Sequence, residues 1–174
     1  LLLRAPDAKL VKRIAGLRAD PSPLGLLHAE LADMASRIRL EDIELEFFNI
    51  FVGIGRGEVL PYASYYLTGF LHERPLARLR GDLAALGIER AQGMCEPEDN
   101  IGIIFEVMGG LISGQLPAPA GTDRRIFEQH LQSWASRFFT DLELAKSAKF
   151  YRTVGRIGRV FMEIEAEAFA LGDD

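Results

Sequence analysis

The spacing of apolar residues between regularly placed helix breakers constrains this chain more than any other feature. Between those breakers, apolar residues recur at intervals of three and four, the period of a helix that is buried on one face. No segment has the clear alternation of a half-buried strand. The sequence therefore predicts an all-α fold with about eight or nine helices. A chain of 174 residues can bury one sizeable core, so we expect residues 1–174 to form a single domain.

The breakers also set the expected helix bounds. A proline suits the first turn of a helix, and glycine is a natural stop after the last one. The expected helices are Pro6 to Leu17, Leu24 to Leu40, Glu41 to Phe51, Pro61 to Glu73, Pro75 to Leu86, Pro97 to Ile112, Thr122 to Thr140, and Asp141 to Leu171 with one break.

The N-terminal residues and the apolar runs bear on membrane association. The chain begins with three leucines and no initiator Met, so we expect that part of the native N-terminus lies upstream. The apolar runs, of which Ile101 to Phe105 is the longest outside that triplet, are too short for a signal peptide or a membrane span. We therefore expect no stable membrane insertion.

Charge and metal-ligating residues exclude several classes of function. A net charge of −5 argues against a general nucleic-acid binder, which needs a basic surface. The single Cys95 allows no internal disulfide, which fits a reducing cytoplasm. The histidines His28, His72 and His130 are far apart in sequence and lack metal-ligand spacing, so we expect no metal site.

Alternating glycines follow the third expected helix, in the run from Val52 to Glu58. Such a pattern could cradle a phosphate, but a dinucleotide fingerprint needs a preceding strand and a following helix. Here a helix precedes the run and Pro61 follows it. The sequence favours a turn, and nucleotide contact through Gly53 to Gly57, with Gly55 as a groove residue, is the alternative.

The run Glu96-Pro97-Glu98-Asp99-Asn100 places three carboxylates at an expected helix start. Acidic side chains are stabilising near the positive end of a helix, so the run can be explained as a helix start alone. It can also be a binding site. Glu106 lies on a helix face formed otherwise by glycine and serine, where it points either into solvent or into a groove.

The same run resembles the Glu-Pro-x-Asp-His signature of the TorD/DmsD/NarJ family of chaperones. The segment Leu60 to Leu67 resembles the family's Pro-aromatic-x-Ser-x-Tyr block, and Glu106-Val107-Met108 resembles its Glu-x-Met. The likeness covers about residues 40–170. Further matches are Pro75 to Arg80, Leu86-Gly87-Ile88, His130 to Trp134, Phe138-Phe139 and Phe150-Tyr151.

One position departs from the family pattern. Asn100 stands where the family usually has histidine, and an asparagine cannot titrate near neutral pH. Any role that needs a protonatable imidazole there is therefore in doubt.

The resemblance implies a cytoplasmic chaperone, not an enzyme, with no cofactor of its own. The alternative is an accessory protein that binds a nucleotide or the molybdenum cofactor through the Gly53 to Gly57 loop. The partners of the chaperone would be the twin-arginine leader and the apo-form of a molybdenum-containing oxidoreductase. The run from Arg56 to Tyr62 looks closest to family members that serve formate-dehydrogenase-like enzymes. A monomer or a homodimer is compatible with the family. The residues implied in leader binding are Tyr62, Ser64, Tyr66, Glu96, Pro97, Glu98, Asp99 and Asn100, with Gly55 and Glu106 as further groove residues.

Overall fold

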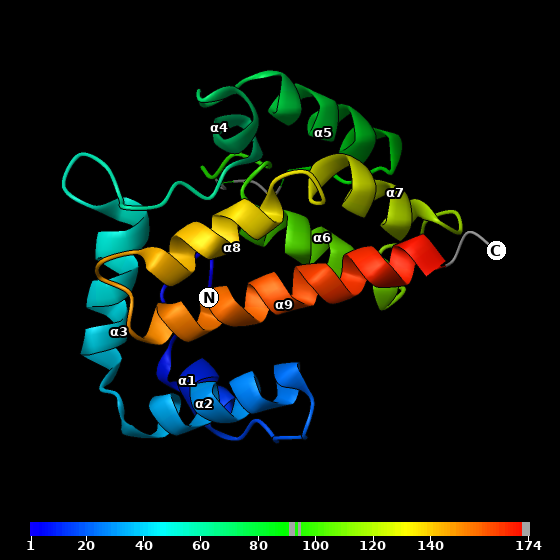
Figure 1. The fold of residues 1–174 in the computed structure, drawn as a ribbon. Coiled ribbons are helices and arrows are strands. Elements are labelled where there is room, and N and C mark those ends of the chain that lie inside the picture. Colours follow the sequence, from blue (N-terminus) through cyan, green and yellow to red (C-terminus); the bar gives the residue numbers. More distant parts are fainter. Residues whose placement is uncertain (91–92, 94, 172–174) are drawn as a thin grey trace. The chain divides into compact units, whose positions relative to one another are not determined.

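The computed structural model describes residues 1–90, 93 and 95–171, and these residues form helices joined by loops (Figure 1). The all-α prediction is confirmed, since the only pairing of extended backbone within those ranges is an isolated bridge between Tyr62 and Asn100. The elements are α1 Ala8–Ala15, α2 Pro23–Arg37, α3 Leu40–Phe47, the π-helix η1 Phe48–Val52, α4 Ala63–Thr68, α5 Arg74–Ala85, α6 Ile101–Ile112, α7 Thr122–His130, α8 Ala135–Leu144 and α9 Phe150–Leu171.

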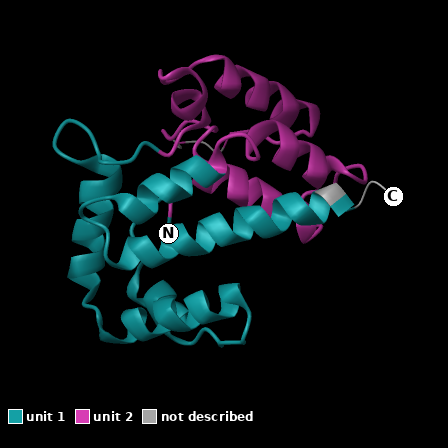
Figure 2. Ribbon diagram, in the orientation of Figure 1, with its two compact units in different colours: residues 1, 3–60, 136–174 teal, residues 2, 61–135 magenta. Residues whose placement is uncertain are grey.

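The chain divides into two compact units (Figure 2). Unit 1 combines residues 3–60 with the segment from residue 136 onward, and unit 2 is the continuous stretch 61–135; residues 1 and 2 belong to units 1 and 2 respectively. The single domain expected from chain length stays a prediction. Within the described residues, none of the helices has the length and apolar character needed to cross a membrane.

In unit 1, two glycines of α9 let α8 approach closely. A Cβ atom on Gly155 would lie 2.6 Å from the backbone nitrogen of Glu143, and one on Gly158 would lie 2.1 Å from the ring of Phe139. Both distances are shorter than a Cβ contact allows. Glycine is therefore required here by packing.

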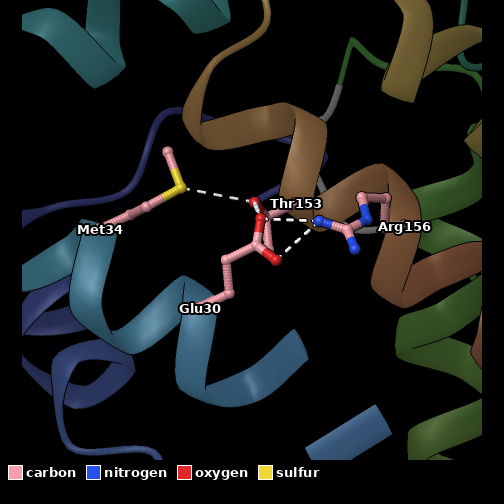
Figure 3. Close-up of polar contacts among 4 residues, drawn as sticks. All are labelled: Glu30, Met34, Thr153 and Arg156. Atoms are coloured by element: carbon pink, nitrogen blue, oxygen red, sulfur yellow. Dashed lines mark hydrogen bonds and ion pairs between the residues drawn. The ribbon is translucent and has the colours of Figure 1, made fainter. Parts of the chain in front are cut away.

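Polar contacts join α2 to α9 in the same unit (Figure 3). The carboxylate of Glu30 pairs with Arg156 Nη1 at 2.6 and 2.8 Å, and the hydroxyl of Thr153 lies 2.9 Å from Glu30 Oε1 and 3.4 Å from Met34 Sδ. Thr153 is almost fully buried, so the hydrogen bond satisfies a hydroxyl that water cannot reach.

A buried carboxylate from α3 caps the start of α9. Glu46 accepts hydrogen bonds from the backbone N–H groups of Lys149 at 2.8 Å and of Phe150 and Tyr151 at 3.3 Å each. The first N–H groups of a helix have no partner within the helix, and a carboxylate is the strongest acceptor for them. Glu46 thus fixes where the C-terminal helix begins.

The glycine run after η1 is a turn. Gly53 has a φ of 63°, and the turn closes through hydrogen bonds from Glu58 N to Asn49 O at 3.2 Å and from Val59 N to Ile50 O at 2.9 Å. No helix begins after it until α4. The turn therefore lacks the helix N-terminus that phosphate cradles use.

Several expected helix bounds between residues 61 and 144 are wrong. Helix α4 ends at Thr68 because Gly69 is left-handed, with a φ of 82°, so Phe70 lies beyond the helix and is exposed. The segment expected from Thr122 to Thr140 breaks after His130, and Gly121, not Thr122, is the N-cap of α7. Asp141, the expected start of the last helix, instead lies inside α8.

The most consequential correction concerns α6. Its N-cap is Asn100 and its first turn contains no acidic residue, so Pro97, Glu98 and Asp99 precede the helix. The expected helix start at Pro97 is therefore wrong, and the carboxylates lie before the first turn of α6. Their positions need another physical reason, which the contacts around them supply.

Candidate functional site

Two segments of unit 2 that are far apart in sequence lie side by side at the start of α4 and α6. Tyr62 and Asn100 form an antiparallel bridge, with hydrogen bonds from Ala63 N to Asp99 O at 3.0 Å and from Ile101 N to Pro61 O at 2.8 Å. The two sequence blocks that carried the family resemblance are therefore joined by backbone hydrogen bonds.

The buried side chain of Asp99 stabilises the junction between these two segments, at the starts of α4 and α6. Its Oδ2 accepts the backbone N–H of Ser64 at 2.8 Å, and Asp99 is only 1% exposed. Ser64 is fully buried, and its hydroxyl accepts the backbone N–H of Glu73 at 3.3 Å. Both residues were expected to contact a leader, and the structure places both inside the protein.

Glu96 is the centre of a second, half-buried set of contacts. Its Oε1 accepts hydrogen bonds from the Tyr62 hydroxyl at 2.5 Å and from Asn100 Nδ2 at 2.9 Å. Its backbone carbonyl accepts one from Arg90 at 3.0 Å. Burial and the adjacent Glu96 carboxylate raise the pKa of Tyr62 well above its usual value, so the phenol stays a donor at physiological pH.

Asn100 performs two functions that explain an amide at this position. Its Oδ1 accepts the N–H of Gly102 at 2.9 Å and so caps α6, while its Nδ2 donates to Glu96. The N–H of Gly102 needs an acceptor and the carboxylate of Glu96 needs a donor. The oxygen and the nitrogen of one amide group supply both at once. The contacts made by Asn100 therefore involve no change of protonation.

Glu98 is the carboxylate of this segment that pairs with a cation. Its Oε2 lies 2.8 Å from Arg80 Nη2 of α5. Burial has the largest single effect and raises the pKa of Glu98. The hydrogen bond from Arg80, a backbone hydrogen bond and the positive charges of Arg80 and Arg90 together outweigh it, so that pKa lies below its usual value. The glutamate is mostly covered while the guanidinium is about half exposed, so the pair lies at the protein surface.

The remaining predicted residues lie around this junction or away from it. The carbonyl of Pro97 accepts the N–H of Asn100 at 3.1 Å and forms the turn before α6. Tyr66 is half-buried, with its ring centroid 5.4 Å from that of Trp134. Glu106 is on the exposed face of α6, and Gly55 belongs to the exposed turn in unit 1.

Sequence reasoning missed the arginines. Arg80 pairs with Glu98, and Arg90 donates to the backbone carbonyl of Glu96. The positions of the two arginines in the sequence do not predict these contacts. Sequence reasoning also missed the pairing of His130 with Asp82, 48 residues apart. In the part of the chain that the structure describes, no group of His, Cys, Asp and Glu could hold a metal ion.

We call residues Glu96 to Asn100 the acidic segment. Their polar side chains form a set of hydrogen-bond acceptors that contacts with the rest of unit 2 hold in place. Asp99 and Asn100 face inward and fix the acidic segment, whereas Glu96 and Glu98 present partly accessible carboxylates. A carboxylate held in one orientation can accept paired hydrogen bonds from a guanidinium group. The arrangement fits binding of a cationic peptide and has no nucleophile paired with a base.

Comparison with known proteins gives a consistent result. The profile of the family described as "Nitrate reductase delta subunit" matches residues 17–140. The chain is 26% identical over 176 residues to chaperone protein TorD of Vibrio cholerae serotype O1, covering 93% of this chain and 80% of the relative. It is 26% identical over 155 residues to chaperone protein TorD of Vibrio atlanticus, covering 80% and 72%.

The fold is also similar to that of a solved structure. A crystal structure described as that of a proposed redox enzyme maturation protein from Archaeoglobus fulgidus superposes with a TM-score of 0.63. It is 20% identical in sequence, and the match covers 93% of this chain and 88% of that one. At this identity the likeness concerns the fold.

Proposed function

Because this chain belongs to the nitrate reductase delta subunit family, whose relatives include the TorD chaperones, we propose that it is a cytoplasmic chaperone that binds the twin-arginine leader of one molybdenum-containing oxidoreductase. The family is one of redox-enzyme maturation chaperones and not of enzymes. In this proposal the chain holds the leader, the apoprotein or both until the client's cofactor is loaded, and thereby delays export. It needs no cofactor of its own.

The observation that supports leader binding is the ion pair that Glu98 forms with an arginine side chain. This carboxylate already accepts a guanidinium, that of Arg80, at 2.8 Å at the surface of unit 2. A twin-arginine leader offers the same chemical group twice, followed by an apolar stretch. Guanidinium–carboxylate pairs are among the stronger hydrogen-bonded contacts in proteins because both partners are charged and their geometries match.

The other residues of the acidic segment have supporting roles in this proposal. Glu96 offers its second carboxylate oxygen, while Tyr62 and Asn100 orient the first. Asp99 and Ser64 keep the two segments joined and do not touch the leader. Tyr66 beside the junction is half-buried and supplies aromatic surface for the apolar stretch.

The client and the oligomeric state are finer points of the same proposal. The run from Arg56 to Tyr62 favours a formate-dehydrogenase-like client. Either a monomer or a homodimer is compatible with this proposal. Nucleotide binding through Gly53 to Gly57 has no specific support, since no helix begins after that turn until α4.

Calorimetric titration with synthetic leader peptides tests the proposal. Each leader is compared with a scrambled peptide of the same composition, so that charge alone cannot produce the signal. We expect a dissociation constant near 1 μM, or about −8 kcal/mol, for one leader and none measurable for its scramble. No heat from any leader above its scramble would refute leader binding.

A matched pair of variants locates the binding surface. Glu98→Gln removes one carboxylate charge from the acidic segment and should weaken leader binding about tenfold, equivalent to about 1.4 kcal/mol. Glu44→Gln removes the same charge from an exposed position on α3 in unit 1 and should leave affinity unchanged. Equal affinities of the two variants would remove Glu98 from the leader site.

A further inference from the structure

Unit 2 contains a second polar site, which lies outside the acidic segment. A pocket of about 500 Å³ opens between α5 and α7, lined by Arg78, Gly81, Asp82, Gln129 and His130. Its volume is in the range of small-molecule sites. None of the residues proposed to bind the leader lines it.

A buried histidine and a carboxylate form the inner wall of this pocket. His130 is only 6% exposed, and its Nε2 donates to Asp82 Oδ2 across 2.7 Å. The backbone carbonyl of His130 accepts the indole N–H of Trp134 at 2.6 Å, which fixes the end of α7. The imidazole is therefore held in place from both its ring and its backbone.

The negative charge of Asp82 is already compensated. One oxygen accepts from His130, and the other lies 3.9 Å from Arg125 Nη1. Counting Arg78 and Arg125 as cations and Asp82 as the anion, the site has a net charge of +1 with neutral His130. An anionic group entering the pocket therefore meets a net positive charge and not an exposed carboxylate.

Two exposed side chains at the pocket have unused donors. Neither Arg78 nor Gln129 has a side-chain hydrogen bond or ion pair within the described part of the chain, although both line the pocket. An arginine fork binds the paired oxygens of a carboxylate or phosphate, and an amide N–H₂ adds a neutral donor. The unused donors match an oxyanion.

Gly81 leaves the wall of the pocket open. A Cβ atom built on it has nothing within 4 Å, so no packing requirement explains glycine here. Glycine inside a helix is unfavourable relative to alanine. Its presence between Arg78 and Asp82 keeps the space beside the two charged side chains empty.

We propose that this pocket binds a small organic anion through its carboxylate or phosphate group, with Arg78 and Gln129 as the donors. Asp82 and His130 form the polar wall of the pocket, and Arg125, 3.9 Å from Asp82, adds positive charge beside it. Because the pocket is larger than a bare anion needs, the natural ligand carries an organic body beside the anionic group. The site is independent of leader binding and would exist even if the acidic segment bound nothing.

Thermal unfolding with inorganic phosphate and with succinate tests the proposal, against sodium chloride at equal ionic strength. A ligand that binds only the folded state raises Tm in a saturable way. We expect a saturable rise in Tm with phosphate, with succinate or with both. The probe that produces the rise shows whether the pocket binds a phosphate or a carboxylate group. A rise no greater than that in chloride for both probes overturns the proposal.

Four variants separate the pocket from general electrostatics. Arg78→Gln should reduce affinity at least tenfold, whereas Arg18→Gln, an equal loss of charge at an exposed position in unit 1, should change it less than twofold. Gly81→Leu should abolish the saturable rise by filling the pocket, while Gly81→Ala preserves it. Unchanged affinity in Arg78→Gln, or loss in Arg78→Gln with full binding in Gly81→Leu, would place the anion elsewhere. If Gly81→Leu fails to fold, the Arg78 and Arg18 pair alone decides.

Discussion

The carboxylate of Asp99 accepts the backbone N–H of Ser64 at 2.8 Å, across 35 positions of sequence and with almost no exposure to solvent. This hydrogen bond joins the segment before α6 to the first turn of α4. An effect of Asp99 on leader binding would therefore act through the position of the acidic segment. Loss of stability and loss of binding should then accompany each other.

Asp99→Ala should destabilise the protein by about 1–3 kcal/mol, because it leaves the buried N–H of Ser64 without an acceptor. Asp99→Asn keeps an acceptor oxygen and should cost less. Urea unfolding of the three proteins, with similar m-values, measures both differences. An alanine variant as stable as the asparagine variant would show that this hydrogen bond does not hold the junction.

The Arg80–Glu98 pair predicts a pH dependence. The pKa of Glu98 is lowered from its usual 4.5, so the folded state favours the charged form more than the unfolded state does. Its contribution to stability is present above the unfolded-state pKa and is lost as the pH falls through the folded-state pKa. Because Arg80 is half exposed, we expect at most about 1 kcal/mol.

Comparison of wild type with Glu98→Gln isolates this contribution. The two unfolding free energies should differ at pH 7 and converge as the pH is lowered below 4.5, because glutamine cannot ionise. Raising the salt concentration at pH 7 should narrow the same gap. A difference that is constant from pH 7 to pH 3 would indicate that shape, and not charge, distinguishes the two side chains.

The helical class followed from the sequence because apolar periodicity reports which face of each helix is buried. The boundaries that failed were decided by single residues. Gly69 ended α4 before Phe70, and Asn100 capped α6 three residues after the proline that was expected to start it. Either residue could have been placed by its capping chemistry, but Pro97 offered a competing start.

The candidate site was only partly predictable, for a different reason. Family resemblance identified Tyr62, Glu96 and Asn100, which do contact one another. It could not tell that Asp99 faces inward, because a short polar run gives no period from which burial can be inferred. The partners Arg80 and Asp82 were missed because their contacts join segments 18 and 48 residues apart.

Two glycine substitutions should have opposite effects. Gly109→Ala, on the exposed face of α6 with nothing within 4 Å of the new Cβ, should stabilise the protein by about 0.5–1 kcal/mol. Gly155→Ala places a Cβ 2.6 Å from the backbone of α8 and should destabilise by about 1–3 kcal/mol. Guanidinium unfolding measures the change in unfolding free energy for both variants. Changes of the same sign would contradict the packing described for α8 and α9.

The expected single domain can be tested with the chain's one tryptophan, Trp134, which belongs to unit 2. Gly155→Ala perturbs unit 1, at a site formed only by unit 1 residues. If residues 1–174 unfold as one cooperative domain, the Trp134 fluorescence transition should move to lower denaturant together with the helix signal from circular dichroism. The control is Asp99→Ala, which perturbs unit 2 and should move the fluorescence transition in either case. If Asp99→Ala lowers the denaturant midpoint of the fluorescence transition but Gly155→Ala leaves that midpoint unchanged, the two units unfold separately.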